Sequence, residues 1–527
     1  MQLTNAKDKT KHLTLANEID FVVFEKRSGQ RTHKVSPTQL GLVEVLSHHL
    51  GVDLFVVHRL DKETSGLILF AKNKKMAQDF AVLFETHQIQ KNYLFLTDGD
   101  HKKTEFSVKT HIEKTDKTYI NNPHKEFNSE TDFKFIKKIS DQINLWEALP
   151  KTGKPHQIRL HAELSGIPIL GDHLHGGSPF FRMALHAFEL SFTVDNKKYS
   201  YQSQAALCFT KPIHNLGDFV ENEFENLKKQ IHLEENQTYR IYHRGLNEDE
   251  IRIDLYGTVI WVYWYKKDSP TESDISSLDQ FCKKNNFIYV VRHMINRGQG
   301  VGGLEHKDLY YTDCPEKWIA NEHQIKIELR RDQGFSPGLF LDQRSNRSWI
   351  FDNSKNKSVL NLFSYTSVFS VAAALGGANQ ITTVDASAAF LNWSKDNFKL
   401  NDINPEQHEF FAQDSLLFLK GAIKKNRKWD MIVCDPPSFG RTKTTTWKID
   451  KDLPELIQLM ESCLSSKGVI LFTCNYEKWN LEDLKKIIKK SVKSKQIQFI
   501  DLPIPDLDFE FPDSFESLIM GCFVNFK

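Results

Sequence analysis

The chain has 527 residues, which is too long for one hydrophobic core and predicts about three domains. Lys and Arg number 69 against 68 Asp and Glu, which excludes a chain that is basic throughout, so any nucleic-acid surface must be a local patch. Seven cysteines without a CxxC pair indicate reduced thiols, and no apolar run approaches the ~18 residues of a membrane span. The first eight residues are polar and resemble no signal peptide, so we expect a cytoplasmic protein without membrane contact.

The first candidate site lies between two predicted strands, after a strand at residues 21–24 and a helix at residues 40–50. Residues 54–57 and 67–71 are apolar, and Thr-Ser-Gly between them marks a turn. Asp61 therefore lies on a short connection, beside Arg59. A carboxylate held there has the position of a nucleophile or base, although Asp is also a common turn residue. The local pattern leaves both interpretations open.

A set of ordered motifs surrounds Asp61. Residues 58–66 read His-Arg-Leu-Asp-Lys-Glu-Thr-Ser-Gly, which resembles the signature of the RluA-type RNA pseudouridine synthases. The family's other segments follow in order: Lys-Asn-Tyr at 91–93, Thr-Gly-Lys-Pro-His-Gln-Ile-Arg-Leu-His at 152–161, Gly-Ile-Pro-Ile-Leu-Gly-Asp at 166–172 and Leu-His-Ala at 185–187. Such an ordered set is far more specific than one short motif. Lys154 stands where the family has Arg, which keeps the charge but loses the planar fork.

This resemblance implies an α+β synthase domain with a mixed or antiparallel sheet over residues 1–217. It implies isomerisation of uridine to pseudouridine without a cofactor. Asp61 would be the nucleophile, Tyr93 would stack on the base and help to remove the final proton, and Arg159 would pair with Asp61. Arg59 would intrude into the RNA and offset the cost of flipping the target nucleotide. The other RNA-binding candidates are His58, Lys154 and His156.

The middle of the chain has a different character. Residues 218–236 predict an amphipathic helical connector, and residues 237–335 form a strand-rich domain that the second resemblance below relates to RNA contact. The run Trp-Val-Tyr-Trp-Tyr at 261–265 is either a base-stacking platform or a strand buried on both faces. Residues 297–303, Arg-Gly-Gln-Gly-Val-Gly-Gly, form a basic loop that is a phosphate-binding candidate, although it lacks a P-loop ending.

The last third predicts a nucleoside-binding sheet. A strand at 358–363, a turn at 364–367, a helix at 368–375 and a strand at 381–384 lead to Asp385. Strands at 408–412 and 430–434 end near Asp414 and Asp435, and ligands of open α/β sheets bind at such strand ends. The first turn has no glycine, which argues against an NAD-binding domain. Two prolines stiffen Asp-Pro-Pro-Ser-Phe at 435–439, which suits gripping a flat base.

This assembly resembles the class I S-adenosylmethionine-dependent methyltransferases, and among them the RlmI/RlmK-type ribosomal-RNA enzymes. The matching strings include Gly-Leu-Phe-Leu-Asp-Gln-Arg at 338–344, Asn-Leu-Phe-Ser-Tyr-Thr at 361–366 and Phe-Ser-Val-Ala-Ala at 369–373. The resemblance implies a Rossmann-like, doubly wound domain over residues 336–527, with Asp385 on the cofactor's ribose and Asp414 on its adenine side. The implied cofactor-binding residues are Asn361, Phe363, Ser364, Tyr365, Thr366, Asp385, Asp414 and Asp435. The implied grip on the substrate base consists of Pro436, Pro437, Ser438 and Phe439.

Two features of the last domain bear on its activity. Ser367 and Val368 replace the family's Gly-Gly, and their side chains would crowd the cofactor's methionine end. Cys474 follows a strand where enzymes that methylate carbon 5 of cytosine carry a nucleophile, but it is equally well a core thiol. With an inert thiol, a guanine nitrogen becomes the target.

The sequence therefore predicts an α/β multidomain, bifunctional RNA-modifying enzyme that acts on ribosomal RNA, with S-adenosylmethionine as the cofactor of the last domain. We expect neither a metal site nor an obligate protein partner. The alternative is a pseudouridine synthase whose last domain is a non-catalytic RNA-binding module.

Overall fold

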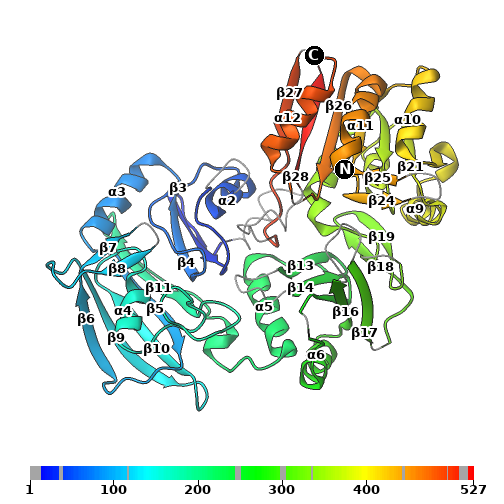
Figure 1. The fold of residues 1–527 in the computed structure, drawn as a ribbon. Helices are drawn as coiled ribbons and strands as arrows, with labels where there is room; N and C mark the ends of the chain where they lie inside the picture. The colour runs from blue at the N-terminus through cyan, green and yellow to red at the C-terminus, as the bar shows by residue number, and fades with distance from the viewer. Residues whose placement is uncertain are drawn as a thin grey trace. The chain divides into compact units, whose positions relative to one another are not determined.

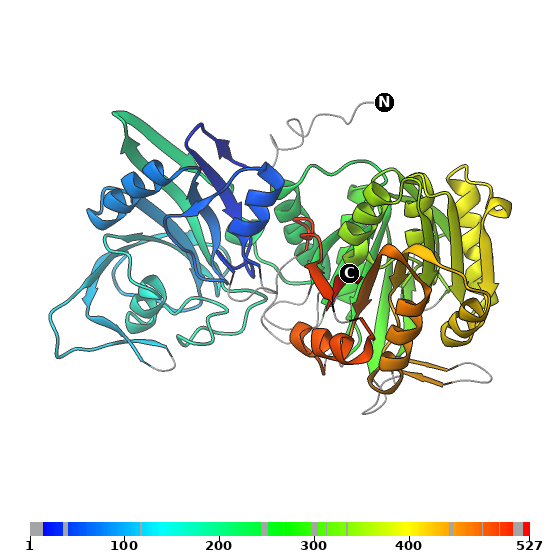
Figure 2. The same ribbon diagram turned by 90° about the horizontal axis from the view of Figure 1, so that it is seen from above.

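The computed structural model describes residues 14–34, 40–115, 118–243, 251–266, 268–296, 304–311, 313–333, 336–441, 446–476, 478–494, 496–509 and 520–526. The chain forms two compact units, drawn in Figure 1 and Figure 2. The first comprises residues 1–233, 241–253 and 264–285, and the second comprises residues 234–240, 254–263 and 286–527. The predicted boundaries at residues 217, 236 and 335 remain predictions.

The first unit is built on a ten-stranded sheet in the order β1-β2-β4-β11-β5-β10-β9-β6, with β3 paired to β4 and β12 to β11. Strands β4 and β11 are parallel, and the other pairs described in this sheet are antiparallel, so the predicted mixed sheet is confirmed. The strands are β1 (Ala16–Asn17), β2 (Phe21–Lys26), β3 (Phe55–Val56), β4 (Ser65–Ala71), β5 (Gln90–Thr97), β6 (Glu105–Thr110), β9 (Ser129–Lys138), β10 (Asn144–Pro150), β11 (Leu185–Val194) and β12 (Lys197–Gln202).

Helix α3 packs against β4, and helix α4 packs against β6, β9 and β10. All seven residues of β4 are buried, as the apolar run predicted. A separate two-stranded ribbon is formed by β7 (Ile112–Lys114) and β8 (Tyr119–Asn121). The helical elements of the unit are α2 (Leu42–Leu50), α3 (Lys74–Glu85), α4 (Gln157–Leu164), η2 (Leu207–Phe209), α5 (Leu216–Gln230) and α6 (Glu272–Lys284).

Helix α6 lies in a region that the sequence predicted only as strands. Three of its side chains are buried, Leu278, Phe281 and Cys282, which is a sparse apolar pattern in a polar segment. Its start carried a readable signal, because the Thr271 hydroxyl accepts the N–H of Asp274 while the Asp274 carboxylate accepts the N–H of Thr271. Helix α5 confirms the predicted amphipathic helix but ends at Gln230.

The middle sheet runs in chain order, β13-β14-β15-β16-β17. Its strands are β13 (Thr238–His243), β14 (Ile251–Tyr256), β15 (Val259–Trp264), β16 (Ile288–Asn296) and β17 (Leu304–Tyr311). Every residue of β15 is buried, and Trp261 stacks on Trp318 at 6.1 Å. The base-stacking interpretation of residues 261–264 is therefore wrong, and the buried-strand interpretation is correct. The basic glycine-rich loop at 297–303 lies outside the described residues.

The second unit contains a seven-stranded sheet in the order β22-β21-β20-β23-β26-β28-β27. The strands β22, β21, β20, β23 and β26 are parallel, and β28 runs antiparallel to both of its neighbours. The order reverses direction at β20, which comes first along the chain among the strands of this sheet, and this confirms the predicted doubly wound sheet. Its strands are β20 (Ser358–Leu362), β21 (Gln380–Asp385), β22 (Glu409–Ala412), β23 (Trp429–Cys434), β26 (Leu464–Cys474), β27 (Ile497–Asp501) and β28 (Met520–Phe526).

The helices of this unit fall into two groups, in which α7 contacts α8 and α8 contacts α9, while α11 contacts both α10 and α12. Helices on both faces explain why all but one residue of each of the central strands β20 and β23 is buried. The helical elements are η3 (Leu341–Gln343), α7 (Arg344–Asn353), α8 (Val368–Leu375), α9 (Ala388–Leu400), η4 (Pro405–Gln407), α10 (Ser415–Lys424), α11 (Ile449–Cys463) and α12 (Leu481–Ser491). Two ribbons complete the unit: β18 (Lys317–Glu322) with β19 (Ile325–Arg330), and β24 (Phe439–Arg441) with β25 (Thr446–Lys448). Among the described residues, none of the helices is both long and apolar enough to pass through a membrane.

Candidate active sites

The loop that carries Asp61 is held by a buried lysine. Lys26 is 1% exposed, and its ammonium donates to the carbonyl oxygens of Lys62 at 2.7 Å, Gln30 at 2.7 Å and Arg27 at 3.0 Å. A turn closes the loop where the N–H of Thr64 donates to the Asp61 carbonyl at 3.2 Å. The carboxylate of Asp61 thus sits on a fixed backbone. Sequence reasoning missed Lys26, because it lies 35 positions before Asp61 and belongs to no motif.

His58 and Arg59, which were predicted to bind RNA, differ in their surroundings. The Nε2 atom of His58 accepts the N–H of Leu69 at 3.0 Å, and its ring stacks on Phe84 at 4.9 Å. Burial, and the nearby Lys91 ammonium, lower the pKa of His58 to about 3. His58 therefore fastens the loop to β4 as a neutral ring, whereas Arg59 is exposed. RNA contact by either residue stays a prediction.

Arg159 joins two carboxylates. Its Nη1 donates to Asp61 Oδ2 at 3.1 Å, the contact that the resemblance implied, while Nε and Nη2 donate to Asp172 at 2.6 and 2.7 Å. Although burial works against the charge, the carboxylates of Asp172 and Asp61 raise the pKa of Arg159 above its ordinary value. The guanidinium therefore stays charged and aims Asp61 from a fixed position. Asp172 was part of a predicted motif, but its role as the support of Arg159 was not predicted.

The other predicted residues of this site lie on different elements. Tyr93 is on β5, and burial together with the charge of Asp61 raises the pKa of its hydroxyl, so the phenol stays protonated. Lys154 is exposed in the turn before α4. His156 is the residue immediately before α4 and has a left-handed backbone with φ 55°. A role in RNA binding stays a prediction for both Lys154 and His156.

The motif segments meet where β4 runs beside β11. The hydroxyl of Ser65 lies 2.8 Å from His186 Nδ1, and the guanidinium of Arg182 also donates to this hydroxyl. Gly66 has φ 108°, and a Cβ there would lie 2.2 Å from the carbonyl oxygen of Ala187. Only glycine allows the two strands to approach this closely, which explains the Ser-Gly that ends the first motif.

In the second unit, the loop after β20 has an unusual backbone. Phe363, Tyr365 and Ser367 all have positive φ angles, of 52°, 49° and 62°. Left-handed non-glycine residues are costly and cluster at functional sites. The Asp385 carboxylate stabilises the loop by accepting the N–H groups of Tyr365 at 2.9 Å and Ser387 at 2.8 Å. Burial raises the pKa of Asp385, while these two donors oppose that shift.

Several residues that the resemblance assigned to the cofactor face the protein interior. Asn361 is 2% exposed and donates to the Ser370 hydroxyl at 2.9 Å. The hydroxyls of Tyr365 and Thr366 donate to the backbone carbonyls of Ser336 and Gly338 at 3.1 and 2.6 Å. These hydrogen bonds fasten the three side chains to the supports of the loop, and ligand contact by Asn361, Tyr365 and Thr366 stays a prediction. The loop's backbone still lies where the prediction placed it.

Ser364 differs from its neighbours. It is 8% exposed, and within the described residues its buried hydroxyl has no hydrogen-bond partner, so a bound ligand with a polar group would satisfy it. The hydroxyl of Ser367 lies 2.6 Å from that of Ser394 on α9 and is fully buried. Because this side chain is directed to α9, the crowding expected from Ser367 has no basis in the structure.

Asp435 follows β23 and is the most perturbed carboxylate of this edge. It accepts from Thr473 Oγ1 and from Gln343 Nε2, both at 2.8 Å. Burial raises the pKa of Asp435 to about 6, aided by the charge of Asp342 and opposed by the two donors. A carboxylate tuned in this way is a hallmark of reaction and binding sites. Sequence reasoning missed Thr473 and the role of Gln343, although Gln343 lay inside a quoted string.

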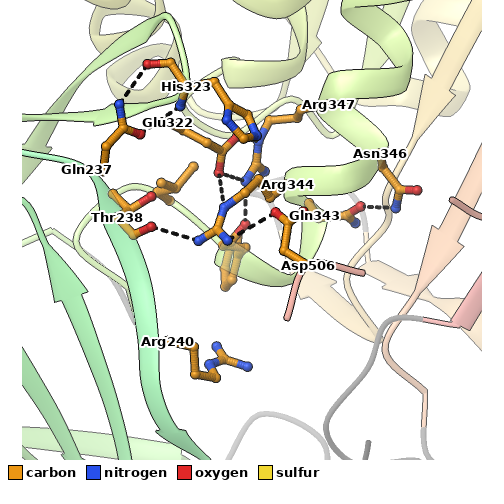
Figure 3. A network of polar contacts seen from close by, with 12 residues as sticks. Gln237, Thr238, Arg240, Glu322, His323, Gln343, Arg344, Asn346, Arg347 and Asp506 are labelled. Atoms are coloured by element: carbon orange, nitrogen blue, oxygen red, sulfur yellow. Dashed lines mark hydrogen bonds and ion pairs between the residues drawn. The ribbon is translucent and has the colours of Figure 1, made fainter. Parts of the chain in front are cut away.

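Gln343 is positioned by a buried ionic network (Figure 3). The next residue, Arg344, donates to Asp508 at 2.8 and 3.0 Å, and Arg347 makes two bonds of 2.5 Å to Glu322. Asp508 and the other nearby carboxylates raise the pKa of Arg344 even though the guanidinium is buried. These charges fix the start of α7, and with it the amide that holds Asp435.

The remaining predicted residues lie at the same edge of the sheet or next to it. Asp414 caps α10, because its carboxylate accepts the N–H of Leu417 at 3.0 Å. The Ser438 hydroxyl donates to the carbonyl of Asn475 at 2.6 Å, and the indole of Trp447 donates to the carbonyl of Pro437 at 2.6 Å. The prolyl loop is thus fastened to the segments after β24 and β26. Base contact by Pro436, Pro437, Ser438 and Phe439, and ligand contact by Phe363, stay predictions.

Cys474 ends β26 and is fully buried. Burial raises the pKa of its thiol to about 12, and the carboxylate of Asp435 adds to this shift. Catalytic cysteines need a lowered pKa and an accessible sulfur. The surroundings of Cys474 therefore favour the interpretation as an inert core thiol.

The two units thus carry two different sites: an aspartate aimed by an arginine on a mixed sheet, and carboxylates that end the parallel strands of a doubly wound sheet. Together they define a chain with two enzyme domains. The family described as RNA pseudouridylate synthase matches residues 20–164, and the family described as S-adenosylmethionine-dependent methyltransferase matches residues 289–491. A relative in this methyltransferase group is 31% identical and is covered over 73% of its own length, so the chain belongs to these methyltransferases and carries an RNA pseudouridylate synthase domain ahead of them.

Two relatives and one solved structure are similar to more than half of this chain. The putative ribosomal RNA large subunit methyltransferase YwbD of Bacillus subtilis is 31% identical over 55% of this chain and 73% of its own length. The ribosomal RNA large subunit methyltransferase K/L of Shewanella sp. (strain MR-4) is 31% identical over 54% of this chain, but only 41% of that protein is covered. The structure of SMU.776, a putative methyltransferase complexed with SAH, has a TM-score of 0.51, with 25% identity over 64% of this chain and 87% of its own.

Proposed function

We propose that the chain is a bifunctional RNA-modifying enzyme. The first unit isomerises a uridine to pseudouridine, and the second methylates a base of ribosomal RNA. The observation that carries the first half is the pair formed by Asp61 and the buried Arg159, which Asp172 supports. The names of the two relatives described above, a putative and an assigned ribosomal RNA large subunit methyltransferase, support the second half.

In the synthase reaction Asp61 attacks the target nucleoside, the glycosidic bond breaks, and the freed uracil turns so that carbon 5 meets the sugar. Arg159 orients Asp61, because its guanidinium is held in place by Asp172. Tyr93 supplies a flat ring beside Asp61, and the exposed Arg59 and Lys154 meet the RNA. The reaction needs no cofactor.

In the methyltransferase domain, S-adenosylmethionine supplies the methyl group when it is bound. The strained loop at residues 363–367 and the unsatisfied hydroxyl of Ser364 fit such a ligand. Asp385 fixes that loop and still offers lone pairs to ribose hydroxyls, since each of its oxygens accepts one backbone N–H. Asp435 and the prolyl loop after it hold the acceptor base.

The acceptor atom follows from Cys474. Methylation at carbon 5 of cytosine needs a thiolate that adds to the ring, and a buried thiol with a pKa of about 12 does not supply one. A ring or exocyclic nitrogen carries its own lone pair and needs no such nucleophile. We therefore propose a base nitrogen, with guanine as the first candidate, as the methylated position.

Nucleoside mass spectrometry of ribosomal RNA from a deletion strain and its parent tests both halves. The loss of one pseudouridine and one methylated purine is expected, and plasmids that encode Asp61→Asn or Asp435→Asn should each restore only the modification of the other domain. A cofactor-dependent rise in melting temperature is expected as well, since a ligand at 100 times its Kd stabilises by about 2.7 kcal/mol. If no methylation is lost and no rise occurs, the last domain is an RNA-binding module.

A further inference from the structure

One face of helix α4 carries a second polar chain beside the pair of Arg159 and Asp172. His156, Arg159 and Glu163 are spaced by three and four positions, which places them on the same side of the helix. Asp172 and His175, also three positions apart, come from the loop that follows. Two sets of polar contacts therefore join helix α4 to this loop. One links Asp61, Arg159 and Asp172, and the other links His156, His175 and Glu163.

The contacts of the second chain are direct. His156 Nδ1 lies 3.0 Å from His175 Nε2, and His175 Nδ1 lies 3.1 Å from Glu163 Oε2. The side chain of His175 is 3% exposed and that of Glu163 is 40% exposed, so Glu163 is the solvent end of these contacts. The motif accounts for His156, but neither His175 nor Glu163 was singled out from the sequence.

The chemistry of these contacts fixes where the protons lie. A carboxylate oxygen accepts hydrogen bonds, so the contact with Glu163 Oε2 places a hydrogen on His175 Nδ1. The other nitrogen of a neutral His175 is then an acceptor, so His156 Nδ1 must donate to it. In neutral His156 the lone pair is therefore on Nε2, an atom without a hydrogen-bond partner among the described residues.

The surroundings keep His156 neutral. Burial lowers the pKa of His156, and the cation of Arg159 lowers it further, while Asp61 and Asp172 act in the opposite direction. The other titratable groups that face the ring are His175 and, from β8, Tyr119 at 5.1 Å.

We propose that Nε2 of His156 is the base that takes the proton from carbon 5 of the uracil once the new carbon–carbon bond has formed. His175 and Glu163 are positioning residues that hold this tautomer. The inference rests on the proposed synthase function and deepens it. It also replaces Tyr93 in the last step, because a phenol whose pKa is raised stays protonated and cannot accept.

The step balances as follows. The C5–H bond breaks, and its electron pair forms the C5=C6 double bond. The electrons of the C6=N1 double bond move to N1, which takes a proton from water. His156 becomes an imidazolium, stabilised through His175 by the Glu163 carboxylate, and then returns its proton to water.

The test uses the full chain and ribosomal RNA from a deletion strain, labelled with tritium at carbon 5 of uridine. The variant is His156→Asn, because Asn tolerates the left-handed backbone that this position requires. Loss of a general base is expected to slow tritium release by about 10²-fold. RNA with 5-fluorouridine separates the steps, since fluorine cannot leave carbon 5 as a cation. The variant should therefore rearrange the fluorinated RNA as fast as the parent does.

A second variant tests the positioning residues without risk to the core. Glu163→Gln removes a half-exposed carboxylate. This variant should slow tritium release. It should also shift the acidic limb of the profile of release rate against pH to lower pH, because the His156 imidazolium loses a stabilising negative charge. A merely structural role would slow the reaction without moving the limb. His173→Asn, an exposed histidine of the same loop, is the matched control and should leave the rate unchanged.

Each outcome is decisive. Tritium release by His156→Asn within about twofold of the parent would overturn the inference, given the size of general-base effects. Equal slowing on fluorinated RNA would also overturn it, because His156 would then act before the C5–H bond breaks. A parent chain that releases no tritium would instead refute the synthase function itself.

Discussion

Arg159 holds two carboxylates of different burial, and the removal of each should have a different consequence. The carboxylate of Asp172 is fully buried and accepts bonds of 2.6 and 2.7 Å, whereas that of Asp61 is 29% exposed and accepts one bond of 3.1 Å. Asp172→Asn would leave a guanidinium that is 5% exposed without its main counter-charge. Breaking a buried ion pair in this way costs about 3–5 kcal/mol. In a domain of this size the loss lowers the melting temperature by roughly 10 °C.

Asp61→Asn should behave in the opposite manner. Its single, partly solvated contact is worth at most about 1 kcal/mol to stability. Pseudouridine formation should nevertheless vanish, because a carboxamide is no nucleophile. Asp172→Asn should retain the reaction at a rate reduced by about 10²-fold, the usual cost of a catalytic group displaced by about 1 Å.

The assay combines thermal unfolding of the full chain with tritium release from uridine-labelled ribosomal RNA. Asp141→Asn, an exposed residue of the same unit, is the control that should change neither quantity. If Asp61→Asn destabilises the chain as much as Asp172→Asn does, or if Asp172→Asn melts like the parent, then Asp172 does not carry the support of Arg159 and the reasoning fails.

Three further predictions concern the core of each unit. The rate at which Cys474→Ala methylates ribosomal RNA, measured with labelled S-adenosylmethionine, should lie within about threefold of the parent rate, because the thiol is buried. A rate reduced by about 10²-fold or more would show that the thiol is a nucleophile. Folding raises the pKa of Asp435 from 3.8 to about 6, so its stabilising contribution is present below pH 3.8 and is lost as the pH rises through 6. The free energy of unfolding of Asp435→Asn, measured in urea, should therefore rise relative to that of the parent by up to about 3 kcal/mol between about pH 4 and pH 7. A difference that does not change with pH would contradict this. Gly66→Ala should cost about 3 kcal/mol or more in thermal unfolding, because its Cβ would lie 2.2 Å from the Ala187 carbonyl oxygen; an unchanged melting temperature would show that β4 and β11 separate easily.

Motifs with a fixed local geometry could be read from the sequence. The apolar runs around Asp61 predicted β3 and β4, and the acids at 385 and 435 were correctly placed at the carboxyl ends of strands. Helix α6 was missed because its three buried side chains give too weak a periodicity, although the Thr271 and Asp274 capping pattern was present. The internal hydrogen bonds of Asn361, Tyr365 and Thr366 could not be predicted, because a string match does not tell which way a side chain points.

The two enzyme domains, the nucleophile candidate and the strands of the doubly wound sheet could be predicted from the sequence, since these depend on patterns within short stretches of chain. Tertiary structure alone decided which groups support them. Lys26 under the Asp61 loop, Gln343 on Asp435 and the chain from His156 to Glu163 all join segments that are distant in sequence or belong to no motif. The burial of Cys474 also could not be predicted, because the pKa of a thiol depends on the solvent and charges around it, which are set only when distant segments pack together.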